Sequence, residues 1–355
     1  MTAGSLRPSH VGRHFNTLAE TETPIFKLPA PYLVVYGKGT DLNKQEVLSN
    51  RAKKKIITQR VILNLIDVAK EKGELEWVKS YWNTWHCQNK VQSANGRLYG
   101  KYCKNRICTV CCGIRKAEII NKYFDTIQKW ESPHLVTITI KAVSARFLKK
   151  RMKDMLAVFK KIVRKFRKWH SRGKAIKLIG IKSLECNFNP FTKEYNPHFH
   201  IIVPNRSTGN LIIQEWQKAW GGKMVNSSAQ DNQKIATLEG ALREVIKYSS
   251  KIFTKPTTKE EEGKKIPPVI YVSALHNILV AMKGLRIFDR FGFDVPKEQR
   301  IKPRKMTQVY EFEDWEFDPV KMDWMNADSQ KPLSGFVIEA ELIGILNQNM
   351  NTVLE

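Results

Sequence analysis

The sequence predicts an α+β fold, an antiparallel sheet with helices on one face, preceded by a small zinc-binding module. Strands and helices mix along residues 134–253 without a regular βαβ repeat. Two of the strands, 174–188 and 197–203, are joined by a short polar turn and form a hairpin, so they are antiparallel. Five of the six cysteines fall between Cys87 and Cys112. In a chain for which we expect no export signal, that clustering indicates a metal site rather than disulfides.

The composition points to a nucleic-acid partner. Lysine and arginine number 60 against 34 acidic residues in a chain of 355, giving a net charge of +26. An excess of this size concerns partners rather than fold, and the usual polyanion is nucleic acid. With 42% hydrophobic residues the chain can build cores, which excludes general disorder. We see no membrane span and no apolar signal segment near the N-terminus, and we expect a cytoplasmic protein.

The pattern of composition divides the chain into four predicted parts. The first contains a helix over 56–73 that Gly73 could cap, and the last is of unknown role. We place the boundaries as follows: a partly helical N-terminal extension (1–80), a cysteine-rich zinc-binding module (81–125), the main α+β domain (126–255) and a C-terminal region (256–355).

Each element of the main domain has its own signal. Residues 134–140 are rich in β-branched side chains and predict a strand. Residues 144–171 predict a helix, because apolar residues recur with a spacing of three and four: Leu148, Met152, Met155, Phe159, Ile162, Phe166 and Trp169. The remaining predictions are strands at 174–188 and 197–203, helices at 210–219, 238–253 and 269–282, and an exposed loop or boundary at 254–268.

Two histidines on the last strand of the hairpin are candidate metal ligands. His198 and His200 lie two residues apart, so both imidazoles project from one face of the strand. The alternative is a pair of surface histidines or histidines with ordinary partners, and for the motif alone the two interpretations are about equal. With the hairpin turn placed at Thr192–Lys193, Glu185 lies opposite His200 on the same face. An acid in an otherwise apolar strand needs a partner, so Glu185 is the candidate third ligand.

The helix 238–253 carries a candidate nucleophile. Tyr248 lies at the edge of the apolar stripe (Leu238, Leu242, Val245 and Ile252), with Glu244 one turn before it and Lys251 one turn after it. A tyrosine that acts as a nucleophile needs a cation or a base nearby, and Lys251 could stabilise the phenolate. The alternative is an amphipathic tyrosine beside a solvated lysine. Glu244 is either a general base acting through water or a surface partner of Tyr248 or Lys247.

The cysteine spacing predicts one structural zinc ion. Four thiolates at tight spacing suit tetrahedral zinc: Cys87, Cys103, Cys108 and Cys111. Cys112 and His86 are spare ligands, and Cys112 could replace Cys111. The alternative is a set of reduced structural cysteines. Aromatic and basic residues interleave beside the cluster, which suits nucleic-acid contact: Tyr99, Lys101, Tyr102, Lys104, Arg106, Arg115 and Lys116.

The polar face of the helix 144–171 is a candidate phosphate track. Thirteen lysines or arginines lie between Arg146 and Lys174 against one acid, Asp154. A charge run is usually a solvated face, but this ratio favours contact with DNA phosphates. The candidate DNA-binding residues are Lys160, Lys161, Arg164 and Lys165.

The ordered set of motifs resembles the HUH endonucleases, and among them the single-tyrosine initiators of rolling-circle plasmid replication. The resemblance runs from about Trp82 to Arg290 and rests on five segments: YCKNRICTVC, KSLECNF, NPHFHIIV, EVIKYSSK and MKGLRIFDRFG. Two departures stand out. The family often has a proline where this chain has Thr109-Val110-Cys111, and the N-terminal extension has no counterpart in the pattern.

The resemblance implies an HUH nuclease fold and a sequence-specific DNA-nicking initiator. His198, His200 and Glu185 would hold catalytic Mn²⁺ or Mg²⁺, and Tyr248 would attack DNA, leaving a 5′-phosphotyrosyl link and a free 3′-hydroxyl primer. The implied partners are a single-stranded or hairpin DNA origin, a host helicase and a polymerase. Two alternatives stay open: an HUH transposase or mobilisation relaxase, and a non-catalytic zinc-containing nucleic-acid-binding protein with the histidines as zinc ligands.

Overall fold

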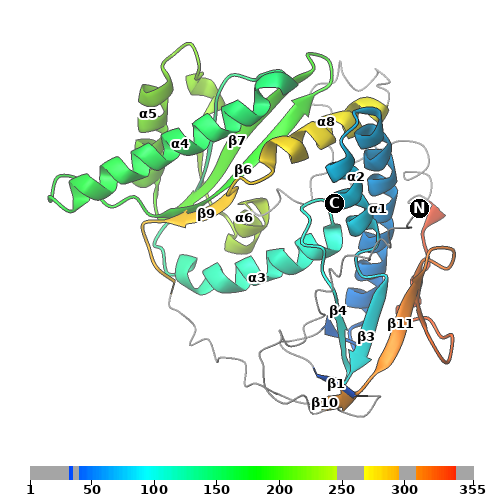
Figure 1. Cartoon of the computed structure of the whole chain (residues 1–355). Helices are drawn as coiled ribbons and strands as arrows, with labels where there is room; N and C mark the ends of the chain where they lie inside the picture. The colour runs from blue at the N-terminus through cyan, green and yellow to red at the C-terminus, as the bar shows by residue number, and fades with distance from the viewer. Residues whose placement is uncertain (1–31, 35–39, 246–267, 296–308, 341–355) are drawn as a thin grey trace, which may run out of the picture. The chain divides into compact units, whose positions relative to one another are not determined.

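The computed structural model describes residues 32–34, 40–245, 268–295 and 309–340 (Figure 1). Over these ranges the protein is α+β, with antiparallel sheets and helices, as the sequence predicts. Two compact units form, and each is assembled from segments that are separated along the chain. The four-part division drawn from composition stays a prediction.

The larger unit contains a five-stranded antiparallel sheet in the order β8-β5-β7-β6-β9. Its strands are β5 (His134–Thr139), β6 (Gly180–Asn189), β7 (Glu194–Val203), β8 (Asp231–Lys234) and β9 (Phe288–Phe291). The hairpin of β6 and β7 confirms the predicted antiparallel pair. However, β6 begins six residues later than predicted, because its first paired residue is Gly180, opposite Phe291 of β9.

Three helices cover one face of this sheet: α4 (Ala145–His170), α5 (Arg206–Trp220) and α8 (Pro268–Met282). All three match predicted helices. Six of the seven apolar residues of the α4 stripe are buried there. The seventh, Trp169, is 37% exposed and lies against Phe166 and beneath the Lys165 ammonium. The stripe is therefore part of the core from Leu148 to Phe166, whereas Trp169 in the last turn is partly exposed to solvent.

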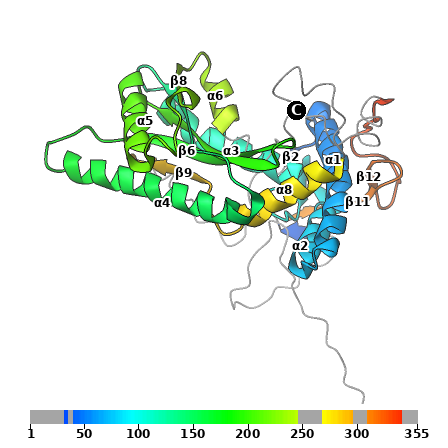
Figure 2. The ribbon, with the colours of Figure 1, turned by 90° about the horizontal axis from the view of Figure 1, so that it is seen from above.

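The opposite face of the sheet is also covered, which corrects the expectation of helices on one face only. α3 (Thr109–Ile127) and α6 (Leu238–Val245) pack on it, and Figure 2 shows them across the sheet from α4. The core on this face includes Ile181 of β6, Ile202 of β7 and Leu242 of α6. This cover lies over the apolar end of the face, at Ile181 and Ile202, whereas Ser183, Glu185, His198 and His200 follow on the same face of β6 and β7.

The smaller unit has a second antiparallel sheet in the order β12-β11-β3-β4-β2. Its strands are β2 (Thr40–Asp41), β3 (Lys90–Ala94), β4 (Arg97–Gly100), β11 (Glu313–Asp318) and β12 (Asp323–Asn326). A separate two-stranded sheet joins β1 (Tyr32–Val34) to β10 (Val309–Glu311). Chain segments far apart in the sequence thus build one sheet, and no local sequence pattern predicts these pairings.

Two further helices precede the cysteine cluster, α1 (Gln45–Glu71) and α2 (Leu75–Trp85). α1 contains most of the helix predicted at 56–73 but begins earlier. Gly73 has a φ of +68°, and its backbone N–H donates to Lys70, while Glu74 donates to Ala69. These contacts confirm the predicted glycine cap. Among the described helices, none combines the length and the apolar character that crossing a membrane requires.

Candidate functional site

The hairpin of β6 and β7 brings the two histidines and the glutamate together. Glu185 pairs with His198, and Ser183 pairs with His200. This corrects the predicted register, in which Glu185 faced His200. Alternate residues share a face, so Glu185 still lies beside both rings. Its Oε2 is 3.8 Å from Nε2 of His198 and 3.7 Å from Nε2 of His200.

Each imidazole faces Glu185 with its Nε2 and is held by a hydrogen bond at its Nδ1. Nδ1 of His198 lies 3.0 Å from the carbonyl oxygen of Asn196, so this nitrogen carries the proton and donates it. Nδ1 of His200 lies 3.1 Å from the hydroxyl of Thr137 on β5, the strand on the other side of β7. The two rings are 4.9 Å apart and nearly perpendicular. Both Nε2 atoms therefore face the same carboxylate.

Two buried polar atoms at this place have no hydrogen-bond partner among the described residues. One is Oε1 of Glu185 and the other is the hydroxyl of Ser183. Glu185 is 5% exposed and Ser183 is fully buried. An unsatisfied buried carboxylate oxygen is costly. The three ligand atoms lie within 4.8 Å of one another, the separation expected around one cation with bonds of about 2.0–2.2 Å.

The donor set fits a divalent cation. Two imidazole nitrogens and one carboxylate oxygen can bind an ion and leave further positions for water and substrate. The hydrogen bonds on the outer nitrogens are the partners that ligating histidines normally have. Glu185, His198 and His200 thus form a candidate metal group, as the sequence predicts.

α6 packs on the face of the sheet from which His198 and His200 project, which we call the histidine face. Its Leu242 and Val245 are buried with Ile202, which projects from β7 on the same side as His198 and His200. The second catalytic group predicted from the sequence lies almost wholly beyond this point. Tyr248 and Lys251 fall outside the described residues, and of Glu244 only the backbone is described.

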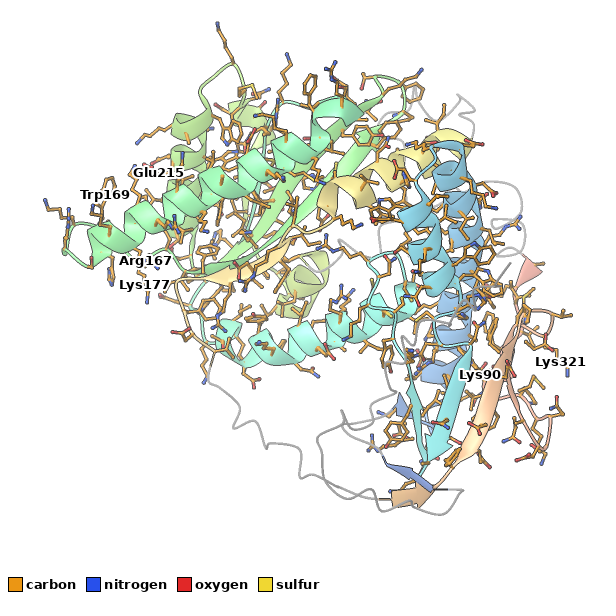
Figure 3. The ribbon with its side chains drawn as sticks, in the orientation of Figure 1. Lys90, Arg167, Trp169, Lys177, Glu215 and Lys321 are labelled. Carbon is orange, nitrogen blue, oxygen red and sulfur yellow. The ribbon has the colours of Figure 1, made fainter. Side chains whose placement is uncertain are left out.

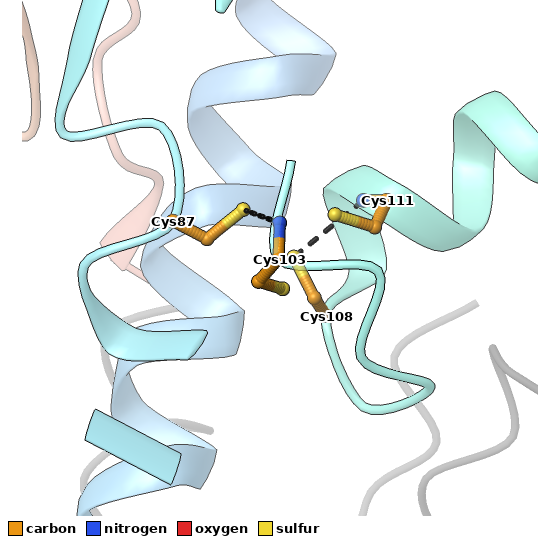
Figure 4. A group of neighbouring side chains, drawn as sticks. All are labelled: Cys87, Cys103, Cys108 and Cys111. Carbon is orange, nitrogen blue, oxygen red and sulfur yellow. Dashed lines mark hydrogen bonds between the residues drawn. The ribbon is translucent and has the colours of Figure 1, made fainter. Parts of the chain in front are cut away.

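Four cysteines form a second candidate metal group (Figure 4). The sulfur atoms of Cys87, Cys103, Cys108 and Cys111 lie within 4.8 Å of one another, the predicted set of ligands. Backbone N–H groups point at two of the sulfurs, from Cys103 to Cys87 at 3.3 Å and from Cys111 to Cys108 at 3.5 Å. Such bonds stabilise thiolates. The arrangement fits tetrahedral zinc.

The two spare ligands have other partners. The thiol of Cys112 is buried and donates to the carbonyl oxygen of Arg106 at 3.0 Å. Nδ1 of His86 lies 3.3 Å from the side-chain nitrogen of Asn89. Neither residue belongs to the group of four sulfurs.

The aromatic and basic residues beside the cysteines are less open to solvent than the sequence suggested. Tyr99 is buried. The guanidinium of Arg106 donates hydrogen bonds to the backbone carbonyls of Met282 and Leu285. Arg106 therefore has partners within the larger unit. Arg115 donates to the Lys104 carbonyl.

The candidate phosphate track on α4 is mostly exposed. Lys160, Lys161 and Arg164 are open to solvent, whereas Lys165 is half-buried and forms an ion pair with Glu215 of α5.

Sequence reasoning missed three further residues of the histidine site: Thr137, Ser183 and Asn196. The position of Thr137 could have been predicted from the sequence. It alternates with apolar residues in the strand 134–140 and so lies on the face opposite to Val136 and Ile138.

The chain is similar to curated proteins named Protein rep. It is 26% identical to one from Bacillus amyloliquefaciens over 147 residues, and 26% identical to one from Bacillus sp over 134 residues. The matches cover 38% and 35% of this chain and 42% of each relative. A third, from Staphylococcus aureus, is 29% identical over 171 residues, 42% of this chain and 69% of the relative. The chain thus spans less than half the length of the first two. No family model and no solved structure matches it.

Proposed function

We propose that this protein is a replication initiator that nicks DNA by metal-dependent tyrosine chemistry and starts rolling-circle replication. The observation that carries the proposal is the convergence of His198 and His200 on Oε2 of Glu185, whose other oxygen, Oε1, is buried with no hydrogen-bond partner among the described residues. The likeness to Rep-named proteins supports an initiator over a transposase or relaxase. It supports DNA as the partner, as does the net charge of +26.

The proposed reaction uses Tyr248 as the nucleophile. Its phenolic oxygen attacks the scissile phosphorus and forms the phosphotyrosyl bond. The phosphorus keeps its bond to the 5′ oxygen of the downstream strand, and its bond to the 3′ oxygen of the upstream strand breaks. The phenolic proton passes to solvent, and the leaving 3′ oxygen is protonated to a free hydroxyl that can prime synthesis. Lys251, three residues further along the sequence, would stabilise the phenolate if the helix predicted at 238–253 extends to it.

The placement of α6 supports this assignment. Val245, the last described residue of α6, is buried on the histidine face, and Tyr248 follows it by three residues. Mn²⁺ or Mg²⁺ bound to His198, His200 and Glu185 would supply a Lewis acid that polarises the scissile phosphate. These residues would also orient that phosphate toward the end of α6.

Glu244 is proposed to act after the first cut. It precedes Tyr248 by four residues, which is one turn of the helix predicted at 238–253. As a carboxylate it could take a proton from a water that attacks the phosphotyrosine, which breaks the bond from phosphorus to the tyrosine oxygen and releases the enzyme.

The test is formation of a covalent adduct. Single-stranded oligonucleotides tiled across the DNA that flanks the gene are incubated with the protein and Mn²⁺, then separated in denaturant. We expect an adduct with wild type, none with Tyr248→Phe, and an accumulated adduct with Glu244→Gln. An adduct that persists in Tyr248→Phe would assign the nucleophile elsewhere. Its absence from wild type with every oligonucleotide would favour a non-catalytic zinc-containing binding protein.

A further inference from the structure

The outer side of α4 carries a row of exposed cations, which we call the α4 cation row: Lys149, Lys153, Lys160, Arg164 and Arg167. All five side chains are exposed. At 3.6 residues per turn they fall within a sector of about 60°, and along the axis they extend for about 27 Å. No ion pair joins any of them to an acid in the described part of the chain.

The acids near α4 pair with lysines outside the row. Asp154 pairs with Lys150 at 2.8 Å, and Glu215 of α5 pairs with Lys165. Figure 3 shows Arg167 and Trp169 on opposite sides of the last turns, with Trp169 on the side of Glu215. In the described part of the chain no acid pairs with the cation row, whereas Lys150 and Lys165 each have an acidic partner.

The row lies away from the candidate metal group. α4 packs on the face of the sheet that Phe199 occupies, with the Phe159 and Phe199 rings 5.5 Å apart. His198 and His200 project from the other face. The sheet and the width of a helix, about 10 Å, separate the two places. One short stretch of DNA cannot touch both.

The chemistry of the row favours duplex DNA. Surfaces that bind single strands interleave cations with aromatic side chains on which bases stack. Among residues 149–167 of α4 the two aromatic residues, Phe159 and Phe166, are both buried. The exposed Phe147 and Trp169 lie beyond the ends of the row and about 100° or more around the helix from it. The row itself therefore offers contacts to phosphates alone. Its length approaches one turn of B-form DNA, about 34 Å.

We propose that the α4 cation row binds the phosphate backbone of duplex DNA, at a segment distinct from the strand that is cut. This inference rests on the proposed function in taking DNA as the polyanion. The row would bind the double-stranded part of an origin, while the residues of the histidine face would act in cleavage of the exposed single strand.

The experiment removes four cations of the row and compares a matched variant. The test variant is Lys153→Ala, Lys160→Ala, Arg164→Ala and Arg167→Ala, and alanine preserves the helix. The control removes four exposed lysines elsewhere: Lys44→Ala, Lys70→Ala, Lys90→Ala and Lys321→Ala. Both lower the net charge from +26 to +22. Affinity is measured from 0.1 to 0.4 M salt for a 30-base-pair duplex and for a single strand of the same length.

The test variant should bind the duplex at least about tenfold more weakly at 0.15 M salt, and its slope of log affinity against log salt should fall by about 3 to 4. The control should retain most of its affinity, and single-strand binding should change less than duplex binding. Equal losses in test and control variants, or equal losses for duplex and single strand, would overturn the assignment.

Adduct formation on a short single-stranded oligonucleotide separates this inference from the proposed function. The test variant should form the adduct at the wild-type rate, because the row is remote from the histidine face. If wild type forms no adduct, the proposed function fails while the duplex measurement still decides the role of the row. If the test variant loses the adduct on the short strand, the row is not a separate surface.

Discussion

Thr137 is the residue on which the geometry of His200 depends. Its hydroxyl lies 3.1 Å from Nδ1 of His200, whereas His198 relies on a backbone carbonyl. A backbone partner survives any substitution, but a side-chain partner does not. Hydrogen bonds of this kind fix the ring and its tautomer, and their loss typically weakens metal binding by 10- to 100-fold. The two histidines therefore differ in how easily they can be disturbed.

We expect Thr137→Val to weaken Mn²⁺ binding by about tenfold or more. Valine keeps the shape of the side chain and favours a strand, so the loss reflects the missing hydroxyl. Calorimetric titration with Mn²⁺ gives the affinity, and Thr137→Ser, which keeps the hydroxyl, serves as the control. Equal Mn²⁺ affinity in the valine variant and wild type would show that His200 needs no such partner.

At the scale of elements, the sequence predicted most of the larger unit because its periodicities are local. The stripe of α4, the strands β5 and β7 and the helix α8 all follow from spacing and residue type. The turn of the hairpin lies one residue earlier than predicted, which moves the pairing by two residues and leaves each side chain on its face. The candidate metal group was therefore predictable despite the register error.

Other features depend on contacts between distant segments. The pairings β3 with β11 and β1 with β10 join residues more than 200 positions apart, and no local pattern encodes them. The packing of helices on both faces of the sheet is weakly indicated by the sequence. In the run Ile201-Ile202-Val203, apolar side chains point both ways, which is typical of a strand buried on both sides.

A buried polar chain links α8 to α2 within the larger unit. His276 of α8 is fully buried. It accepts from the Tyr81 hydroxyl at Nδ1, 2.9 Å away, and donates from Nε2 to Glu74, 3.1 Å away. Burial lowers the pKa of His276 from its ordinary value of 6.5, Lys72 lowers it further, and Glu74 opposes both.

This shift of the His276 pKa has a definite sign for stability. The unfolded chain takes up the proton near pH 6.5, whereas the folded chain does so only at lower pH. The contribution to stability is therefore fully present above about pH 6.5 and is lost as the pH falls toward the lowered pKa. We expect the urea midpoint to fall between pH 7.5 and 5.5, and to fall less in His276→Gln.

The exposed His170 at the end of α4 provides the matched control. His170→Gln makes the same substitution outside the buried polar chain, and it shows how much of the change comes from replacing any histidine. If His276→Gln behaves as wild type, other groups account for the acid sensitivity, and the polar chain does not contribute to it.

At the scale of the whole molecule, the described residues contain two candidate metal groups with different chemistry. One offers four sulfurs and the other two nitrogens and a carboxylate. Four thiolates hold zinc tightly and contribute to folding. A group with open positions exchanges its ion more readily, and Mg²⁺ in particular is held by few protein ligands. The two groups should therefore respond differently to a chelator.

We expect brief treatment with EDTA to stop nicking, and Mn²⁺ to restore it, while one zinc ion stays bound throughout. Native mass spectrometry counts the zinc, and the covalent adduct reports nicking. Cys103→Ser should lose the zinc, whereas Cys112→Ser should keep it, because Cys112 bonds to the Arg106 carbonyl instead of joining the four sulfurs. His198→Ala should keep the zinc and lose the adduct. If the zinc instead follows His198 and survives in Cys103→Ser, the histidine group is a structural zinc site, and the nicking proposal loses its metal.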